Sequence, residues 1–77
     1  MDYHKFGLLD NYAIENLLDQ FIEESIVYGL NKVLVITGKG KVVRPLVKKL
    51  LSQRKDIKKH KPASEFNGGD GAIEIFI

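Results

Sequence analysis

Apolar side chains recur along two stretches of the chain with the spacing of a helix. Residues 11–28 place an apolar side chain at every third or fourth position, which predicts an amphipathic helix. Asp10 can cap the start of this helix, and Gly29 can end it in the left-handed conformation. A second helical pattern spans residues 43–54, with Pro45 in its first turn, where a missing N–H breaks no hydrogen bond.

Strand patterns occupy the rest of the chain. Val33–Thr37 opens with four consecutive apolar residues, mostly β-branched, which indicates a strand buried on both faces. Asp2–Phe6 and Ala72–Ile77 predict a first and a last strand, and Lys58–Lys61 predicts a further, weakly alternating one. The glycine-rich Asn67–Gly71 predicts a turn with positive φ before the last strand.

The predicted order is β-α-β-α-β-β, which indicates an α/β two-layer sandwich. Right-handed crossovers make the first strands parallel and place both helices on one face of a four-stranded mixed sheet. The other face then lacks a covering layer, and we expect apolar surface there to contact a flanking segment or a partner. With 77 residues, 44% of them hydrophobic, the chain forms one domain, residues 1–77, which we expect to be a fragment of a longer protein.

Composition excludes several classes of protein. The chain has no cysteine, which excludes a disulfide framework and a zinc–thiolate site and favours a reducing, cytoplasmic setting. No apolar run is long enough to cross a bilayer, so we expect no membrane partner. His4 and His60 are the only histidines, which argues against a dedicated transition-metal cage. We therefore assign no metal ligands, and the cofactor stays unknown, with a divalent ion such as magnesium left open.

Positive charge is concentrated in one part of the chain. Residues 39–61 contain ten Lys or Arg residues and a single acid, whereas the rest of the chain is strongly acidic and the net charge is only +2. Such segregation indicates a polyanionic partner such as DNA or structured RNA. The alternative is a solvated helix face beside an edge strand whose lysines prevent aggregation.

A short glycine loop stands at the head of this basic segment. Thr37-Gly38-Lys39-Gly40 lies between the buried strand and the second helix, where backbone can approach a ligand and helix N–H groups can bind a phosphate. Positive side chains follow on one side of the helix and can contact successive phosphates without reading sequence. The candidate nucleic-acid-binding residues are Thr37, Gly38, Lys39, Gly40, Lys41, Arg44 and Lys48.

Asp2 and His4 form a second candidate site. Because they are two residues apart on a predicted strand, their side chains project from the same face. A carboxylate beside an imidazole can orient it as a general acid/base, or supply half of a metal site. The alternative is a polar strand end with no chemistry.

These motifs together resemble the Smr (small MutS-related) domain family. The family carries Leu-Asp-Leu-His-Gly, then His- or Thr-Gly-x-Gly, then a Gly-Gly-x-Gly turn, and the matching residues here are Asp2-Tyr3-His4, Thr37–Gly40 and Gly68–Gly71. The helix start Val43-Arg44-Pro45-Leu46 and the strand Ala72–Ile75 also match. One departure is Lys5, which stands where the family usually has glycine.

The resemblance implies a fold similar to the C-terminal domain of translation initiation factor three, and binding to DNA or RNA. It further implies an endonuclease that nicks branched DNA or cleaves RNA, with Asp2, His4 and Lys39 as catalytic residues. Such domains stand alone or end a bacterial MutS paralogue that acts in recombination control and ribosome rescue. A non-catalytic module that docks a parent protein on structured RNA or the ribosome is the alternative. A plain protein-interaction domain would leave the charge segregation unexplained.

Overall fold

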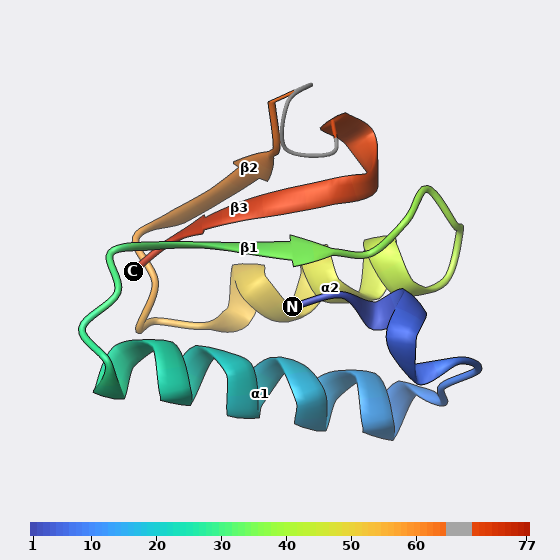
Figure 1. The fold of residues 1–77 in the computed structure, drawn as a ribbon, viewed down its shortest axis with the longest axis horizontal. Coiled ribbons are helices and arrows are strands. Elements are labelled where there is room, and N and C mark those ends of the chain that lie inside the picture. Colours follow the sequence, from blue (N-terminus) through green and yellow to red (C-terminus); the bar gives the residue numbers. More distant parts are fainter. Residues whose placement is uncertain (65–68) are drawn as a thin grey trace.

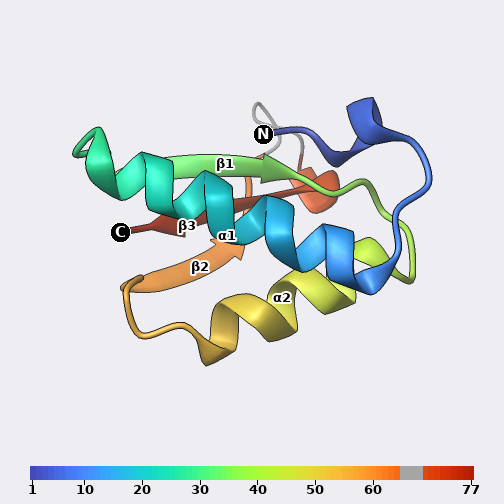
Figure 2. The ribbon, with the colours of Figure 1, turned by 90° about the horizontal axis from the view of Figure 1, so that it is seen from below.

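The computed structural model describes residues 1–64 and 69–77, which form two layers. A three-stranded sheet makes one layer, and two helices side by side make the other, both on the same face of the sheet (Figure 1). Seen from below, the helices lie in front of the strands (Figure 2). The elements are α1 (Asn11–Val27), β1 (Lys32–Ile36), α2 (Val43–Gln53), β2 (Lys59–Pro62) and β3 (Ala72–Phe76).

Helix α1 forms as its sequence pattern predicts. The Asp10 carboxylate caps the helix by accepting a hydrogen bond of 2.8 Å from the backbone N–H of Ala13. After the last helical residue, Gly29 adopts a φ of +71°, as expected for a helix stop. The apolar side of the helix, Ile14, Leu18 and Ile22, is fully buried against the sheet and α2.

Strand β3 lies in the middle of the sheet and pairs antiparallel with both β1 and β2. Its Ile73 and Ile75 are buried opposite Val35 and Val33 of β1, and these side chains form the sheet's half of the core. Three of the predicted strands are therefore confirmed to within one or two residues at their ends.

The predicted four-stranded mixed sheet is wrong. Among the described residues the sheet has three strands, all antiparallel, and the expected strand over residues 2–6 is a 3₁₀ turn, Tyr3–Phe6. The chain turns because the Asp2 side chain accepts from the backbone N–H of His4 at 2.9 Å, while the Asp2 carbonyl accepts from Lys5. Only an isolated parallel bridge between Asp2 and Ile36 follows the expected pairing.

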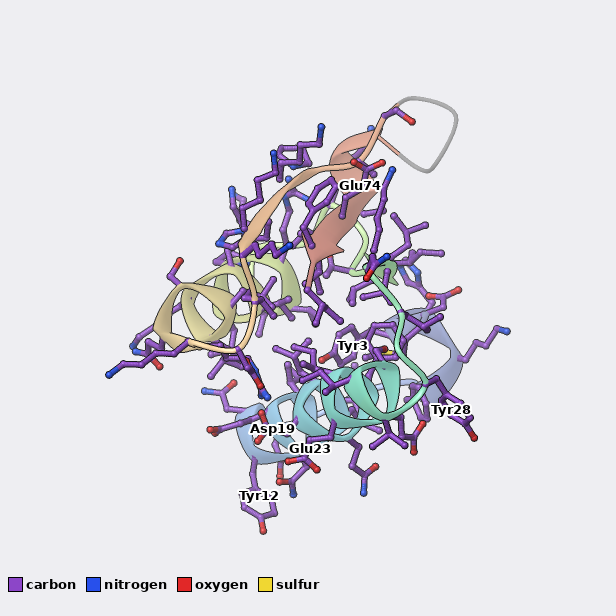
Figure 3. The ribbon with its side chains drawn as sticks, turned by 90° about the vertical axis from the view of Figure 1, so that its left-hand side faces the viewer. Tyr3, Tyr12, Asp19, Glu23, Tyr28 and Glu74 are labelled. Atoms are coloured by element: carbon purple, nitrogen blue, oxygen red, sulfur yellow. The ribbon has the colours of Figure 1, made fainter. Side chains whose placement is uncertain are left out.

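Tyr3 explains why this turn is stable. Its side chain is buried in the core, and its hydroxyl donates a hydrogen bond of 2.8 Å to the carbonyl of Ile14. Burial raises the pKa of the Tyr3 hydroxyl well above its ordinary value. Tyr3 thus anchors the turn to α1, and Figure 3 shows it between that helix and the sheet.

The uncovered face of the sheet is only partly the apolar surface that the sequence predicts: Leu34 and Ile36, which alternate with the core residues Val33 and Val35 of β1, are half-buried there. Its central strand presents Glu74, which is buried, and Phe76, whose ring lies under three lysines. Among the described residues the large exposed apolar side chains lie elsewhere, on the loops and helix ends: Phe6, Leu8, Tyr12, Ile26, Val27, Tyr28, Leu30 and Val42. Neither described helix is long and apolar enough to span a membrane.

The predicted glycine turn is described only in part. Residues 67 and 68 lie outside the described ranges, and Gly69–Gly71 forms a 3₁₀ turn in which Gly69 has a φ of +54°. This positive φ agrees with the expectation that glycine is needed at that point.

An arginine joins the end of α2 to the middle of α1. Arg54, directly after α2, donates to Asp19 of α1 at 2.5 Å and to both carboxylate oxygens of Asp56, at 2.8 and 2.6 Å. The hydrogen bond with Asp56 is the main cause of the raised pKa of Arg54, and it lowers the pKa of Asp56.

We predict that Arg54→Ala lowers the free energy of unfolding by about 1–2 kcal/mol, because two carboxylates lose their partner. Chemical denaturation measures this, with Lys55→Ala, an exposed neighbour of the same charge, as the control. Because the pKa of Asp56 is lowered, its pairing stabilises the fold above about pH 4 and is lost as the pH falls through the lowered pKa. The difference in the free energy of unfolding between wild type and Arg54→Ala should shrink in that pH range. A difference that does not depend on pH, or one no larger than that caused by Lys55→Ala, contradicts this prediction.

Candidate nucleic-acid site

The glycine loop that follows β1 is tied to the start of β3. The backbone N–H groups of Thr37 and Gly38 both donate to the carbonyl of Gly71, each at 2.9 Å. The Thr37 hydroxyl donates to the carbonyl of Gly38 at 2.8 Å, and the Thr37 side chain is buried. Thr37 therefore holds the loop in shape, and its hydroxyl is engaged with backbone rather than directed to a ligand.

The imidazole of His4 rests on Gly38. A Cβ atom added to Gly38 would lie 2.6 Å from His4 Nε2 and 2.9 Å from His4 Cε1, closer than such atoms approach. On its other side, Gly38 approaches Gly71, since a Cβ on Gly71 would lie 3.8 Å from the Gly38 Cα. Only a glycine with its φ of +73° fits between these neighbours. Two motifs far apart in the sequence thus meet at one point.

Asp2 fixes which nitrogen of His4 faces the loop. One oxygen of the Asp2 carboxylate, Oδ1, lies 3.1 Å from His4 Nδ1 and also accepts from the backbone N–H of His4. An ionised carboxylate only accepts, so in the neutral imidazole this contact favours the tautomer with the proton on Nδ1 and a lone pair on Nε2, which lies over Gly38. The His4 side chain is 64% exposed, so Nε2 can exchange a proton with a bound molecule.

Positive side chains lie on the Gly38 loop and continue into α2. Lys39 and Lys41 are exposed on the loop, and Lys48 is exposed further along α2. Arg44 is half-buried, and its Nη1 lies 3.5 Å from the carbonyl of Ala72, the residue that follows Gly71. The start of α2 has no side-chain cap, since Val42 occupies the cap position, so the helix end is not neutralised by a local acid.

The structure brings most of the sequence candidates together and adds one residue. Asp2, His4 and Gly38 meet at the loop, and Arg44 contacts the carbonyl of Ala72, the residue after Gly71. Gly71 was placed in a turn by the sequence pattern, but its carbonyl is the acceptor that shapes the loop. The Gly-Gly-x-Gly motif marked the position of Gly71 without indicating this role. Lys5, at the place of the family glycine, is exposed and does not separate His4 from Gly38.

The donor set does not form a metal cage. Among the described residues, no three His, Asp or Glu side chains come together as a protein-held metal requires. We therefore derive no chemical step through a bound metal.

Comparison with known proteins places this geometry in a family. The family model described as the Smr domain matches residues 7–77, which is most of the chain. The chain belongs to the Smr domain family. The match includes the Gly38 loop and begins after Asp2 and His4. The assignment of those two residues to the candidate site therefore rests on the geometry described above.

Two curated relatives of this Smr domain are large proteins. The chain is 36% identical over 61 residues to the protein named endonuclease MutS2 of Finegoldia magna, and 35% identical over 61 residues to that of Ligilactobacillus salivarius. Each alignment covers 78% of this chain and only 8% of the relative. The Smr domain therefore corresponds to a small part of those proteins.

Solved structures show the same fold. The Smr domain of Thermus thermophilus MutS2 matches with a TM-score of 0.82 at 25% identity, covering 88% of this chain and 86% of that one. YdaL, a stand-alone small MutS-related protein of Escherichia coli, matches with a TM-score of 0.86 at 24% identity, over 100% of this chain and 62% of that one. The expected Smr fold is confirmed, although its strand count here differs from the expectation.

We predict that Gly38→Ala displaces the His4 ring, because the new methyl group would lie only 2.6 Å from Nε2. The control is Gly29→Ala, which has a similar φ of +71° and nothing within 4 Å of the added Cβ. Both substitutions should lower stability by about 1–2 kcal/mol through left-handed strain. In NMR spectra, only Gly38→Ala should abolish the contact between the His4 ring and residue 38. Retention of that contact and of the wild-type His4 shifts would contradict this packing.

Proposed function

We propose that this Smr domain grips the phosphate backbone of DNA or RNA at the Gly38 loop and hydrolyses a phosphodiester bond beside it. The observation that carries the proposal is the position of His4 Nε2, directly over Gly38 at the centre of a positively charged loop. An exposed proton acceptor and a phosphate-binding loop are the two parts that such a reaction requires. The endonuclease names of the MutS2 relatives agree with this chemistry.

Each group then has a distinct role in the reaction. Lys39 and Arg44 hold a phosphate against the loop and stabilise the additional negative charge of the pentavalent transition state. His4 Nε2 takes the proton of the attacking hydroxyl, or of water, and its protonated form returns a proton to the leaving oxygen. Asp2, bound to Nδ1, orients the ring and stabilises the imidazolium while it carries both protons. Asp2 is thus a positioning residue.

The charge distribution determines how the nucleic acid approaches. Ten of the twelve basic residues lie between the loop and the end of β2, whereas α1 carries only acids among its charged residues, including Asp19 and Glu23 (Figure 3). A polyanion is attracted to the first surface and repelled from the second. Because lysine and arginine contact phosphates, we propose recognition of backbone and shape rather than of sequence.

A second function is favoured by the length of the basic surface. Exposed lysines continue along α2 and β2, away from His4, at Lys48, Lys49, Lys55, Lys58 and Lys59. A surface of this extent suits a module that docks a parent protein on structured RNA, such as the ribosome, without cleavage. Binding without product formation would favour this alternative.

We predict that Lys39→Ala weakens binding to branched DNA or structured RNA by about 1 kcal/mol. The slope of log affinity against log salt should fall in magnitude by about 1, as expected for the loss of one phosphate contact. His4→Ala should leave binding nearly unchanged and reduce cleavage about 10²- to 10⁴-fold, because only proton transfer is removed. The matched controls are Lys49→Ala and His60→Ala, which remove the same side chains away from the loop. Binding titrations and nicking assays, with and without magnesium, use the same preparations.

The results separate the parts of the proposal. Cleavage that survives in His4→Ala as well as in His60→Ala would contradict the acid/base assignment. Equal binding by wild type and Lys39→Ala would contradict the phosphate loop. Binding by the wild type with no cleavage of either substrate would support docking on RNA instead of catalysis.

A further inference from the structure

The face of the sheet opposite the helices carries a cluster of charged and aromatic side chains. Alternation along β2 directs His60 toward α2, where its Nε2 lies 3.4 Å from the Ser52 hydroxyl, and directs Lys59 and Lys61 to the opposite face. Figure 3 shows Glu74 of β3 on this outer face, away from both helices. We call the outer cluster Lys32, Lys59, Lys61, Glu74 and Phe76.

The outer cluster is organised around one aromatic ring. The Nζ atoms of Lys59, Lys61 and Lys32 lie 4.9, 5.5 and 5.6 Å from the centre of the Phe76 ring, which is half-buried. Three lysines from the two outer strands therefore converge on a ring at the end of the central strand.

The carboxylate within the cluster does not cancel its charge. Glu74 pairs with Lys32 at 3.4 Å and with Lys61 at 3.9 Å, and its side chain is only 5% exposed. The lysines are about half exposed, so solvent meets positive charge and a ring while the negative charge lies beneath. Three lysines against one carboxylate leave the outer cluster positive.

We propose that the outer cluster binds a single-stranded segment of nucleic acid: the ammonium groups of Lys59, Lys61 and Lys32 move from the Phe76 ring to neighbouring phosphates, and one unpaired base takes their place on the ring. A ring within a positive surface is the combination that single-stranded nucleic acid recognises, because every unpaired base offers a stacking face and every nucleotide a charge. A duplex hides its base faces, so at the outer cluster it is attracted only by the positive charge of the lysines. This inference rests on the proposed binding of nucleic acid at the Gly38 loop.

The outer cluster and the Gly38 loop lie at opposite ends of the same strand. Lys32 begins β1 and Ile36 ends it, just before Thr37 and Gly38, and the six steps from Lys32 to Gly38 span at most about 20 Å at 3.3 Å per residue. That length corresponds to at most about six nucleotides at the stacked spacing of 3.4 Å. A strand held at the loop can therefore reach Phe76 with a short single-stranded tail, and the preferred substrate is one that offers such a tail.

The test compares Phe76→Leu with Phe76→Tyr. Leucine keeps an apolar side chain over the sheet but removes the stacking face, whereas tyrosine keeps that face. Fluorescence anisotropy measures binding to oligothymidylate and oligouridylate of about twelve nucleotides, and to a duplex of equal length. We expect Phe76→Leu to weaken binding of both single strands about fivefold or more, Phe76→Tyr to bind as wild type, and duplex binding to be unchanged.

Lysine variants keep the proposal testable if Phe76→Leu does not fold. Lys59→Ala, which contacts the ring, should weaken single-strand binding about threefold more than Lys49→Ala, which removes an exposed lysine of α2. If wild type, Phe76→Leu and Phe76→Tyr bind single strands equally, and duplex binding still depends on Lys39, the proposal for the outer cluster alone is overturned. Absence of binding to either single strand or duplex at low salt overturns the proposed function as well.

Discussion

The backbone of Gly38 lies between two neighbours that leave no room for a side chain, and the candidate site depends on this close packing. On one side the Gly71 carbonyl accepts the N–H groups of both Thr37 and Gly38; on the other the His4 ring covers the Cα. The first contact joins the ends of β1 and β3, and the second brings the N-terminal turn onto the loop. An acid/base group and a phosphate loop can therefore meet without any loop moving.

Charge is arranged around this point in a way that suits the proposed binding. Asp19 and Glu23 of α1 lie on the side of the helix away from the sheet, and most lysines and arginines lie between the loop and the end of β2. Arg54 is the exception, because it pairs with Asp19 and Asp56 and joins the two helices instead of facing a ligand. The basic segment of the sequence thus contains two kinds of residue: Arg54 stabilises the fold, and the exposed lysines can meet a ligand.

Much of this structure was predictable because its signals are local. Helical periodicity and the Asp10 cap gave the bounds of α1 closely, and the apolar run at Val33 gave β1. The predicted strand at residues 2–6 failed because alternation does not reveal that Asp2 would bond the backbone of His4 and that Tyr3 would turn into the core. The contact of His4 with Gly38 and the role of the Gly71 carbonyl depend on tertiary packing, so no local pattern could give them.

Tertiary packing also explains why the sequence did not predict the arrangement of the outer face of the sheet. Counting apolar residues predicted an exposed apolar layer there, but the side chains of Lys32, Lys59 and Lys61 lie over the Phe76 ring and Glu74 lies beneath them. Long lysine side chains can cover apolar surface while their charged ends stay in water. Residues that appear as simple surface charges in the sequence therefore form an organised cluster once β1, β2 and β3 are side by side.

The most direct test of the central claim is the tautomer and ligand response of His4, measured by long-range ¹H–¹⁵N NMR at a pH where the ring is neutral. The account predicts a proton on Nδ1, held by Asp2, and a free Nε2 whose shift changes together with the amides of Gly38 and Lys39 when a short oligonucleotide is added. A proton on Nε2, or binding that leaves His4 and the Gly38 loop unchanged, would contradict it.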